Sequence, residues 1–431
     1  MSKIHFLPVK YGDSFVIECD KGENHGVVVV DGGPNGCGSI LQAKLDEVGT
    51  PDLMLLTHYD DDHIGGLIQY IKACKKEKKL PAREVWANCA KYAGTEDKPE
   101  EGSAADLISM RTRSALQAVK LGVMLDLIGQ DGGLTWRDDL VEGVAREFPF
   151  ASVEVVSPTE HGRELAIGKQ EKVMPKVDVS DVAESLNTRS VSIIPPLEKL
   201  AEDCPKPPSE KADAEVANAA SIAIVLRCDG LSILMLGDCY PHNVVDYLRR
   251  KGYSEQHPLR VDYVKVAHHG SLHNTSNELM DLIHCNHYII STNGDKFGHP
   301  DREAFAHILC HPTRDRSEKV HFYFNSDMNT LVSKSGRFLL PAELEPYNFE
   351  VHESVSELPL AGLEPDHEPV EEPVAMQVPE PAEGPAPEPV VEPVPEPVEG
   401  PAPKKKKKRI CFLKRLFSGV QVSVDFNSKK D

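Results

Sequence analysis

The sequence lacks several features that would each point to a particular class of protein. Its ten cysteines are scattered and never form a CxxC pair. No secretion signal stands at the start of the sequence, so we expect reduced thiols in a cytoplasmic protein rather than a disulfide framework. No apolar run approaches the length that a membrane-spanning helix requires. A basic excess is also absent, because the formal net charge is −20, and this argues against a simple electropositive nucleic-acid binder.

The chain is long enough for one large domain or two ordinary ones, with 431 residues of which 40% are hydrophobic. We expect a folded domain over residues 1–345. Residues 159–217 within it have weak periodicity and many prolines and charges, which predicts an insertion or flap rather than core. Residues 346–403 interleave proline with Glu and Val, which is typical of a disordered or polyproline-like linker.

A basic run from Lys404 to Arg409 follows this linker, and apolar residues come directly after it. This pattern over residues 404–431 predicts an amphipathic tail. Such a tail suits an anionic membrane surface, giving peripheral membrane association, or an acidic partner or a nucleic acid. The plainer interpretation is a solvated charge run beside a short apolar helix.

In the folded part, strand-like and helix-like segments alternate, which indicates an α/β fold. Polar residues gather at four strand ends, namely 58–63, 237–238, 268–269 and 293–299. Strand ends in a layered α/β protein converge on one rim, so we expect these residues to meet there. A final hairpin is expected over 319–339.

The first of these strand ends carries the densest cluster of metal-ligand residue types. The apolar run 53–56 leads into His58, Asp60, Asp62 and His63, and two glycines follow. Imidazoles and carboxylates are the groups that hold divalent ions. Asp238 arrives from another strand and is placed to bridge, and His268 or His269 can complete the second of two ion sites. Two ions about 3.5–4 Å apart would generate a metal-bound hydroxide for hydrolysis.

Three further residues are candidates for supporting roles. Asp31 ends a short apolar strand beside two glycines, where it either orients a ligand histidine or simply makes a turn. Asn293 and His299 lie on a loop expected to reach the rim, where they contact substrate. The alternative for His299 is a loop-capping histidine next to a proline.

Together these motifs resemble the metallo-β-lactamase superfamily, whose usual motif is HxHxDH. Here Asp60 takes the second histidine position. This HxDxDH variant looks like the metallo-hydrolase domain of the ComEC-type bacterial competence DNA-uptake channel and its soluble relatives. The other motifs that carry this closer resemblance are Asn218-x-x-Ser221, Ala267-His268-His269-Gly270-Ser271 and Gly298-His299-Pro300.

The resemblance implies a four-layer αββα sandwich with a two-ion site at its edge. His58 and Asp60 would hold the first ion, Asp62 and His63 the second, with Asp238 bridging and His268 as the last histidine ligand. Two residues would have further roles: Asp62 would also orient or deprotonate the attacking water, and His269, the alternative ligand, would otherwise contact substrate.

The position of the family's middle histidine holds Ser157-Pro158, and His161 comes several residues late. The first site is therefore expected to be poor in protein ligands. The Asp60 carboxylate shifts the metal preference from Zn²⁺ toward Mn²⁺ or Mg²⁺.

These features predict a metal-dependent hydrolase with two divalent ions, Zn²⁺ or Mn²⁺, acting on a phosphodiester in the manner of a nuclease. Two alternatives stay open. One is a hydrolase of a small ester, lactone or thioester, because a fold does not determine the substrate. The other is a tethered interaction protein whose tail delivers the domain to a membrane or complex.

Overall fold

Two large β-sheets form the centre of the folded unit. The computed structural model describes residues 2–90, 110–130, 132–173, 194–202, 216–228 and 230–360. The first sheet has seven strands, in the order β17 (Glu357–Pro359), β1 (Lys3–Phe6), β2 (Phe15–Lys21), β3 (Asn24–Val30), β4 (Leu53–Leu55), β5 (Glu84–Trp86) and β6 (Thr135–Arg137). The second has eight, in the order β16 (Phe349–His352), β15 (Val320–Phe324), β14 (His287–Ile290), β12 (Tyr263–Lys265), β10 (Leu231–Met235), β9 (Ala223–Cys228), β8 (Ser152–Ser157) and β7 (Ala145–Glu147). A separate small sheet pairs β11 (Leu259–Arg260) with β13 (Ile283–His284).

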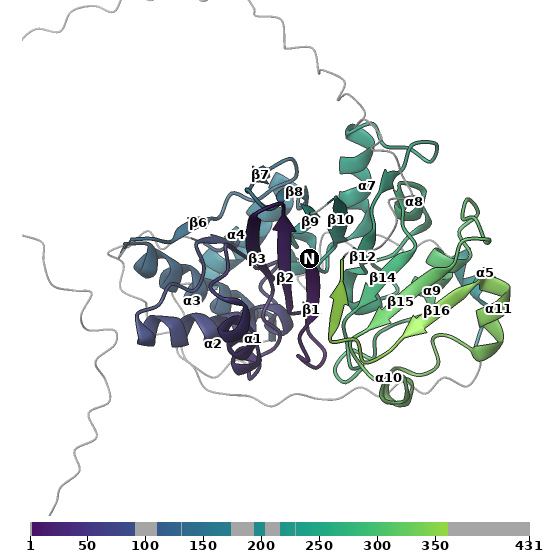
Figure 1. Cartoon of the computed structure of the whole chain (residues 1–431), viewed down its shortest axis with the longest axis horizontal. Helices are drawn as coiled ribbons and strands as arrows, with labels where there is room; N and C mark the ends of the chain where they lie inside the picture. The colour runs from purple at the N-terminus through teal and green to yellow at the C-terminus, as the bar shows by residue number, and fades with distance from the viewer. Residues whose placement is uncertain are drawn as a thin grey trace, which may run out of the picture. The chain divides into compact units, whose positions relative to one another are not determined.

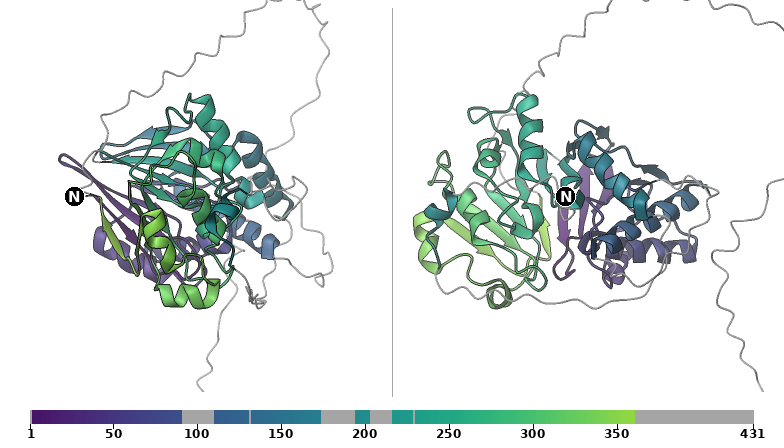
Figure 2. Two further views of the ribbon diagram at one scale, coloured as in Figure 1. Left: turned by 90° about the vertical axis from the view of Figure 1, so that its right-hand side faces the viewer. Right: turned by 180° about the vertical axis from the view of Figure 1, so that it is seen from behind.

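Helices cover the outer face of each large sheet (Figure 1). Those against the first sheet are α1 (Gly38–Val48), α2 (Asp61–Glu77), α3 (Met110–Gln130), α4 (Glu160–Val173) and α6 (Val216–Ala219). Those against the second are α5 (Leu197–Ala201), α7 (Pro241–Arg250), α8 (Asn277–Asp281), α9 (Arg302–Leu309), α10 (Met328–Ser335) and α11 (Leu344–Tyr347). Figure 2 shows the same two groups of helices from the side and from behind.

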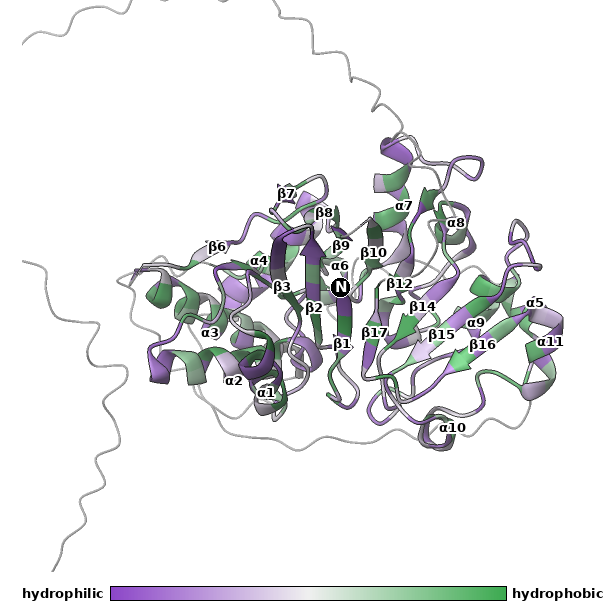
Figure 3. Cartoon of the chain, in the orientation of Figure 1, coloured by the Kyte–Doolittle hydropathy of each residue, from purple (hydrophilic) through white to green (hydrophobic). Residues whose placement is uncertain are grey.

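Three hydrophobic cores follow from the alternation of side chains along the strands. In β10, Ile233 and Met235 face the core between the sheets, and Leu234 faces the core under the second helical layer. In β2, Ile17 faces the inner core and Val16 faces the first helical layer. Figure 3 shows the hydrophobic residues gathered along the strands. One core between the sheets and one under each helical layer make a four-layer αββα sandwich, which confirms the expected fold class.

The hairpin expected over 319–339 is wrong. Strand β15 is followed by helix α10, and β15 pairs in parallel with both β14 and β16. Asp327 begins the helix, because its carboxylate accepts hydrogen bonds from the backbone N–H groups of Asn329 and Thr330. This N-cap favours a helix where the apolar pattern alone indicated a strand.

Two segments contribute more to the fold than their composition indicated. Strands β16 and β17 lie within the range 346–403 that was expected to be linker, and each pairs at the edge of a sheet. Within the expected insertion 159–217, Ala166 of α4 and Leu197 of α5 are buried in the two outer cores. Sparse apolar residues were enough to anchor these short elements. The rest of the expected linker and the basic tail lie outside the described residues.

None of the helices in the described ranges is long and apolar enough to cross a membrane. The eight cysteines within those ranges are free thiols, and seven of them are buried.

Candidate metal centre

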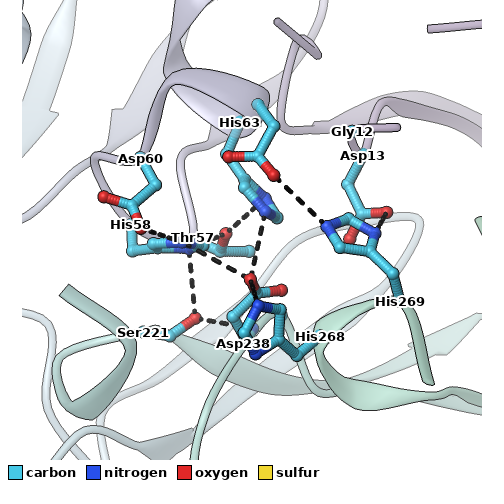
Figure 4. Close-up of polar contacts among 12 residues, drawn as sticks. Gly12, Asp13, Thr57, His58, Asp60, His63, Ser221, Asp238, His268 and His269 are labelled. Carbon is cyan, nitrogen blue, oxygen red and sulfur yellow. Dashed lines mark hydrogen bonds and ion pairs between the residues drawn. The ribbon is translucent and has the colours of Figure 1, made fainter. Parts of the chain in front are cut away.

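The candidate site is built from three connections between strands and the elements that follow them. His58 and Asp60 lie on the loop between β4 and α2, and Asp62 and His63 lie in the first turn of α2. Asp238 follows β10. Figure 4 labels His58, Asp60, His63 and Asp238 together with His268 and His269, which follow β12. Residues 58–63 follow a strand of the first sheet, whereas Asp238, His268 and His269 follow strands of the second. The site therefore forms where the two sheets meet.

Glycines allow helix α2 to approach the loop that follows β3. The Gly66 N–H donates a hydrogen bond to the carbonyl of Gly33 at 2.8 Å. A Cβ atom on Gly66 would lie 1.9 Å from the carbonyl oxygen of Gly32, so no larger residue fits there without displacing backbone. This close approach brings Asp31 against the first turn of α2.

Asp31 determines the orientation of His63. Its Oδ2 lies 2.8 Å from His63 Nδ1, and it accepts hydrogen bonds from the backbone N–H and the hydroxyl of Thr57 at 2.8 and 2.7 Å. Since a carboxylate can only accept, Nδ1 of His63 carries the proton and Nε2 points its lone pair into the site. The structure thus places Asp31 against a candidate ligand histidine.

Thr57 imposes the same tautomer on His58. The threonine hydroxyl gives its only proton to Asp31, so it accepts from His58 Nδ1, which lies 3.1 Å away. Ser221 Oγ lies 3.5 Å from the same nitrogen and also accepts from the backbone N–H of Asp238. His58 therefore presents the lone pair of Nε2 to the site.

His269 is presented by an unusual turn. His268 and His269 have φ of +48° and +56°, and Gly270 continues the left-handed run with φ of +84°. Two consecutive non-glycine residues in this region are uncommon and mark strain at a functional position. His269 Nδ1 donates to the carbonyl of Ser291 at 2.8 Å, which leaves its Nε2 facing the site.

Several buried side-chain atoms that face the candidate site have no hydrogen-bond partner within the described part of the chain. Among the described residues, Nε2 of His58, His63 and His269 and Oδ1 of Asp238 have no hydrogen-bond partner, although all are buried. A buried polar atom left unpaired is costly, so four such atoms converging on one place indicate a ligand. Imidazole nitrogens and carboxylate oxygens are the donor set of a divalent metal ion, and the residues present fit that group.

The potential ligand atoms fall into two overlapping clusters. One joins His58, His63 and Asp238, and the other joins Asp62, His63 and His269, with the atoms of each cluster within 4.8 Å of one another. Asp238 Oδ2 lies 3.7 Å from Nε2 of His58 and 3.5 Å from Nε2 of His63. Asp62 Oδ2 lies 3.5 Å from Nε2 of His269. His63 belongs to both clusters, and Asp238 lies beside it in the first.

Electrostatics at the site also favour cations. Asp60 is 36% exposed, yet desolvation and the charges of Asp62 and Asp238 raise its pKa to about 7. Burial alone would lower the pKa of His63, but Asp238 and Asp31 outweigh it and raise this pKa well above its usual range. Burial and the neighbouring His63 lower the pKa of His58 to about 3. Three carboxylates close together therefore disfavour one another's charge, and a divalent cation would relieve that repulsion.

His268 and His269 are separated by the structure. His269 groups with Asp62 and His63, whereas His268 is 21% exposed and has its Nε2 3.5 Å from Asp238 Oδ2. The expected order, with His268 as the ligand completing the second cluster and His269 as the substrate contact, is therefore not the arrangement that the geometry favours. The turn places His269 inward, because it does not continue the extended backbone of β12.

The remaining predicted residues lie at different depths. His299 is buried beside His268, with ring centroids 5.3 Å apart, and its Nδ1 lies 3.1 Å from Asp301 Oδ2. The amide of Asn293 is instead bonded to Asp295 within its own loop. His161 is exposed on α4 and belongs to neither cluster. Ala166 of the same helix does line a small hollow beside His58.

Two residues of the centre have no counterpart in the sequence predictions. Asp13 and Lys265 form a fully buried ion pair, and Asp13 Oδ1 lies 3.3 Å from His269 Nδ1. Burial alone would raise the pKa of Asp13, but Lys265 and His269 hold it below its usual range. A lysine within the apolar strand 261–267 was the available signal, since a buried lysine requires an anionic partner.

A family model matches the part of the chain that carries the first half of this site. Residues 7–89 match the model of the family described as the metallo-beta-lactamase superfamily. The matched segment contains Asp13, Asp31 and the whole motif from His58 to His63. No curated protein matches the chain.

Two solved structures resemble the chain at low identity. Zn(2+)-bound PqqB from Methylobacterium extorquens is 11% identical, with 83% of this chain and 100% of that chain covered and a TM-score of 0.37. MIM-2 metallo-beta-lactamase is 10% identical, with 61% and 74% covered and a TM-score of 0.25.

Proposed function

We propose that the chain is a metal-dependent hydrolase of the metallo-β-lactamase superfamily, related to the ComEC-type hydrolase domain, that acts on phosphodiesters. The observation that carries the proposal is the convergence of the unpartnered imidazole nitrogens of His58 and His63 on the Asp238 carboxylate. Each of these imidazoles is held in one tautomer by a partner on its other nitrogen. Such support is what a metal site requires of its surroundings.

The residues would divide between two divalent ions, Zn²⁺ or Mn²⁺. Asp62, His63 and His269 would hold one ion. His58, Asp60 and Asp238 would hold the other, with Asp238 shared. His268 points its Nε2 at Asp238 and is placed to supply the nitrogen that Ser157-Pro158 does not. Bound ions would lower the pKa of a water molecule and stabilise negative charge on the substrate.

Asp62 would position the attacking water. Burial alone would raise its pKa, but the neighbouring His269 and His63 imidazoles outweigh burial and lower it below its usual range. The carboxylate therefore stays ionised at neutral pH and accepts hydrogen bonds from a water beside it. Its fixed position in the first turn of α2 limits the direction from which that water approaches.

A cationic and aromatic wall near Asp60 supports the choice of a phosphodiester. Lys296 partly offsets the rise in the pKa of Asp60 that desolvation causes, and its Nζ lies 4.8 Å from the Tyr11 ring centroid and 5.0 Å from that of Phe297. Phe297 is 37% exposed. A lysine attracts a phosphate, and an exposed ring provides a stacking surface for a base, so the pair suits a nucleotide better than a neutral lactone.

The test is hydrolysis by the purified full chain, stripped with chelator and supplied with Mn²⁺, Mg²⁺ or Zn²⁺. The substrates are bis-p-nitrophenyl phosphate, a single-stranded oligonucleotide, a lactone and a thioester. We expect metal-dependent turnover of the two phosphodiesters that is lost in Asp62→Asn and in Asp238→Asn. Asp246→Asn, which changes an exposed carboxylate on α7, is the matched control.

Turnover of only the lactone or thioester would replace the phosphodiester by acyl chemistry at the same site. Metal-independent turnover, or turnover that survives both substitutions, would refute the assigned site. Stripped protein that binds no divalent ion would favour the tethered interaction protein.

A further inference from the structure

A second group of metal-ligand residues lies on the second sheet and shares no residue with the centre described above. It consists of His321 on β15 with Glu350 and His352 on β16. His321 Nδ1 lies 3.0 Å from His352 Nε2 and 3.9 Å from Glu350 Oε2. One potential ligand atom from each residue lies within 4.8 Å of the other two.

The strand register brings these side chains together. His321 is paired with Glu350 in the parallel β15–β16 ladder, and Tyr323 is paired with His352. Paired residues of parallel strands face the same way, as do residues two apart on one strand, so all three ligands lie on one face of the sheet. Their positions are therefore determined by regular backbone rather than by a loop, which is the firmer support for a site.

Aromatic neighbours hold both imidazoles in place. The His321 ring stacks on that of His287, with centroids 4.8 Å apart and planes at 5°. The His352 ring stacks on that of Tyr323, with centroids 4.6 Å apart and planes at 10°. These stacks restrict the rotation of the rings about χ2, so less side-chain freedom remains to be lost when a ligand binds.

We propose that His321, Glu350 and His352 bind one divalent transition-metal ion, Zn²⁺ being the best match to two nitrogens and one carboxylate oxygen. In a tetrahedral site with Zn–N distances of about 2.0–2.1 Å, two nitrogens lie about 3.3–3.4 Å apart. The observed 3.0 Å therefore needs to widen only slightly. The carboxylate of Glu350 is 47% exposed, so an ion and a completing water can reach the site from solvent.

The ion would join β16, the edge strand of the sheet, to β15. Without it, the same residues would be held only by the His321–His352 hydrogen bond and by an exposed ion pair of Glu350 with Lys319, at 3.2 Å. An exposed pair of that kind contributes little to stability. Ion binding would therefore be the stronger of the two ways to secure this edge.

The test compares the chelator-stripped full chain with two variants in Zn²⁺ titrations by calorimetry, with bound zinc counted after equilibrium dialysis. We expect His352→Gln to bind one ion fewer than the unaltered chain. His25→Gln is the matched control, because His25 is exposed and contacts a single carboxylate, Asp20, at 2.7 Å. It should bind as many ions as the unaltered chain.

Equal zinc counts in His352→Gln and His25→Gln would overturn the proposal. Since only the difference between variants is read, the result does not depend on how many ions the Asp238 centre holds. If circular dichroism shows that His352→Gln is unfolded, Glu350→Gln replaces it, because that side chain is half exposed and its loss leaves the imidazoles in place. The zinc-dependent rise in melting temperature should be smaller in either variant than in the control.

Discussion

Asp31 Oδ2 accepts a hydrogen bond from His63 Nδ1 at 2.8 Å and another from the Thr57 hydroxyl at 2.7 Å. The Thr57 hydroxyl in turn accepts from His58 Nδ1 at 3.1 Å. A single buried carboxylate, directly after β3, thus controls the tautomers of two imidazoles that face the site. Removal of its charge should alter both.

Asp31→Asn should weaken divalent-ion binding by about 10- to 100-fold. The asparagine keeps the shape, but its amide nitrogen would face His63 Nδ1 and force the proton onto Nε2, the atom needed by the metal. Chelator competition with Zn²⁺ or Mn²⁺ measures the change. Asp52→Asn is the control, since Asp52 holds Val27 and Arg83 instead of a histidine; equal affinities in the two variants would contradict the orienting role.

His268→Ala and His269→Ala should differ in metal content. The His269 variant should lose one of the two ions of the centre, because His269 completes the cluster with Asp62 and His63. The His268 variant should keep both ions but bind one of them more weakly, since its Nε2 contacts only Asp238. Metal analysis after dialysis decides between them, and the reverse pattern would restore the order predicted from the sequence.

Substitutions in the buried pair of Asp13 and Lys265 should have non-additive effects on the free energy of unfolding. Lys265→Met leaves the Asp13 charge buried without its partner and should lower the free energy of unfolding by about 3–5 kcal/mol. Adding Asp13→Leu removes that charge and should recover most of the loss. Urea unfolding of both variants gives the comparison, and a double variant less stable than the single one would contradict this account.

Glu154 should contribute to stability in a pH-dependent manner. Burial alone would raise its pKa, but Tyr247 at 2.6 Å and Lys251 at 3.2 Å outweigh it and hold the pKa below 4.5 in the folded chain. The unfolded chain therefore takes up this proton first as pH falls. The stabilisation is complete above about pH 4.5 and is lost as pH falls below it through the folded pKa.

Glu154→Gln should accordingly lower the free energy of unfolding near pH 7 by about 1–2 kcal/mol. The difference from the unaltered chain should shrink below pH 4.5. Denaturant melts at several pH values measure it, and a gap that widens in acid would show that the sign is wrong.

Lys296→Ala and Phe297→Ala should raise KM for an oligonucleotide more than they lower kcat. Phe297 packs edge-on against His268 and Lys296 lies over the Phe297 ring, so both are near the centre without being among its clustered ligand residues. Steady-state kinetics with the oligonucleotide and with bis-p-nitrophenyl phosphate separate the effects of the two substitutions. The rise in KM caused by Phe297→Ala should appear only with the oligonucleotide, which has bases. Lys44→Ala, on helix α1 and paired with Glu47, is the control. A fall in kcat at constant KM would place these residues in the chemical step.

Much of this centre could be predicted because its residues are close together in the chain. The motif from His58 to His63 follows one strand, and Asp238 follows another, so the strand-end pattern was sufficient to group them. The choice between His268 and His269 could not be made in the same way. Which of these two histidines points into the site depends on their positive φ angles. These angles reverse the alternation of side-chain directions that an extended strand would give.

Asp13 was missed for a different reason. The short segment Tyr11-Gly12-Asp13-Ser14 is typical of a turn, and only the tertiary contact with Lys265 on the other sheet shows that the aspartate is buried. The edge strands β16 and β17 were missed because the surrounding residues are rich in proline and glutamate. Pairing with an existing sheet edge stabilised them without a strong local preference.

The pairing of those last strands ties the two halves of the sandwich together. Residues 353–356 lead from β16, at the edge of the second sheet, to β17, at the edge of the first, which lies antiparallel to β1. One short segment therefore supplies an edge strand to each sheet. A chain cut after residue 345 would expose the edges of β15 and β1 at once. Such a truncation should aggregate through strand-to-strand pairing, whereas one that ends after residue 360 should remain monodisperse in size-exclusion chromatography.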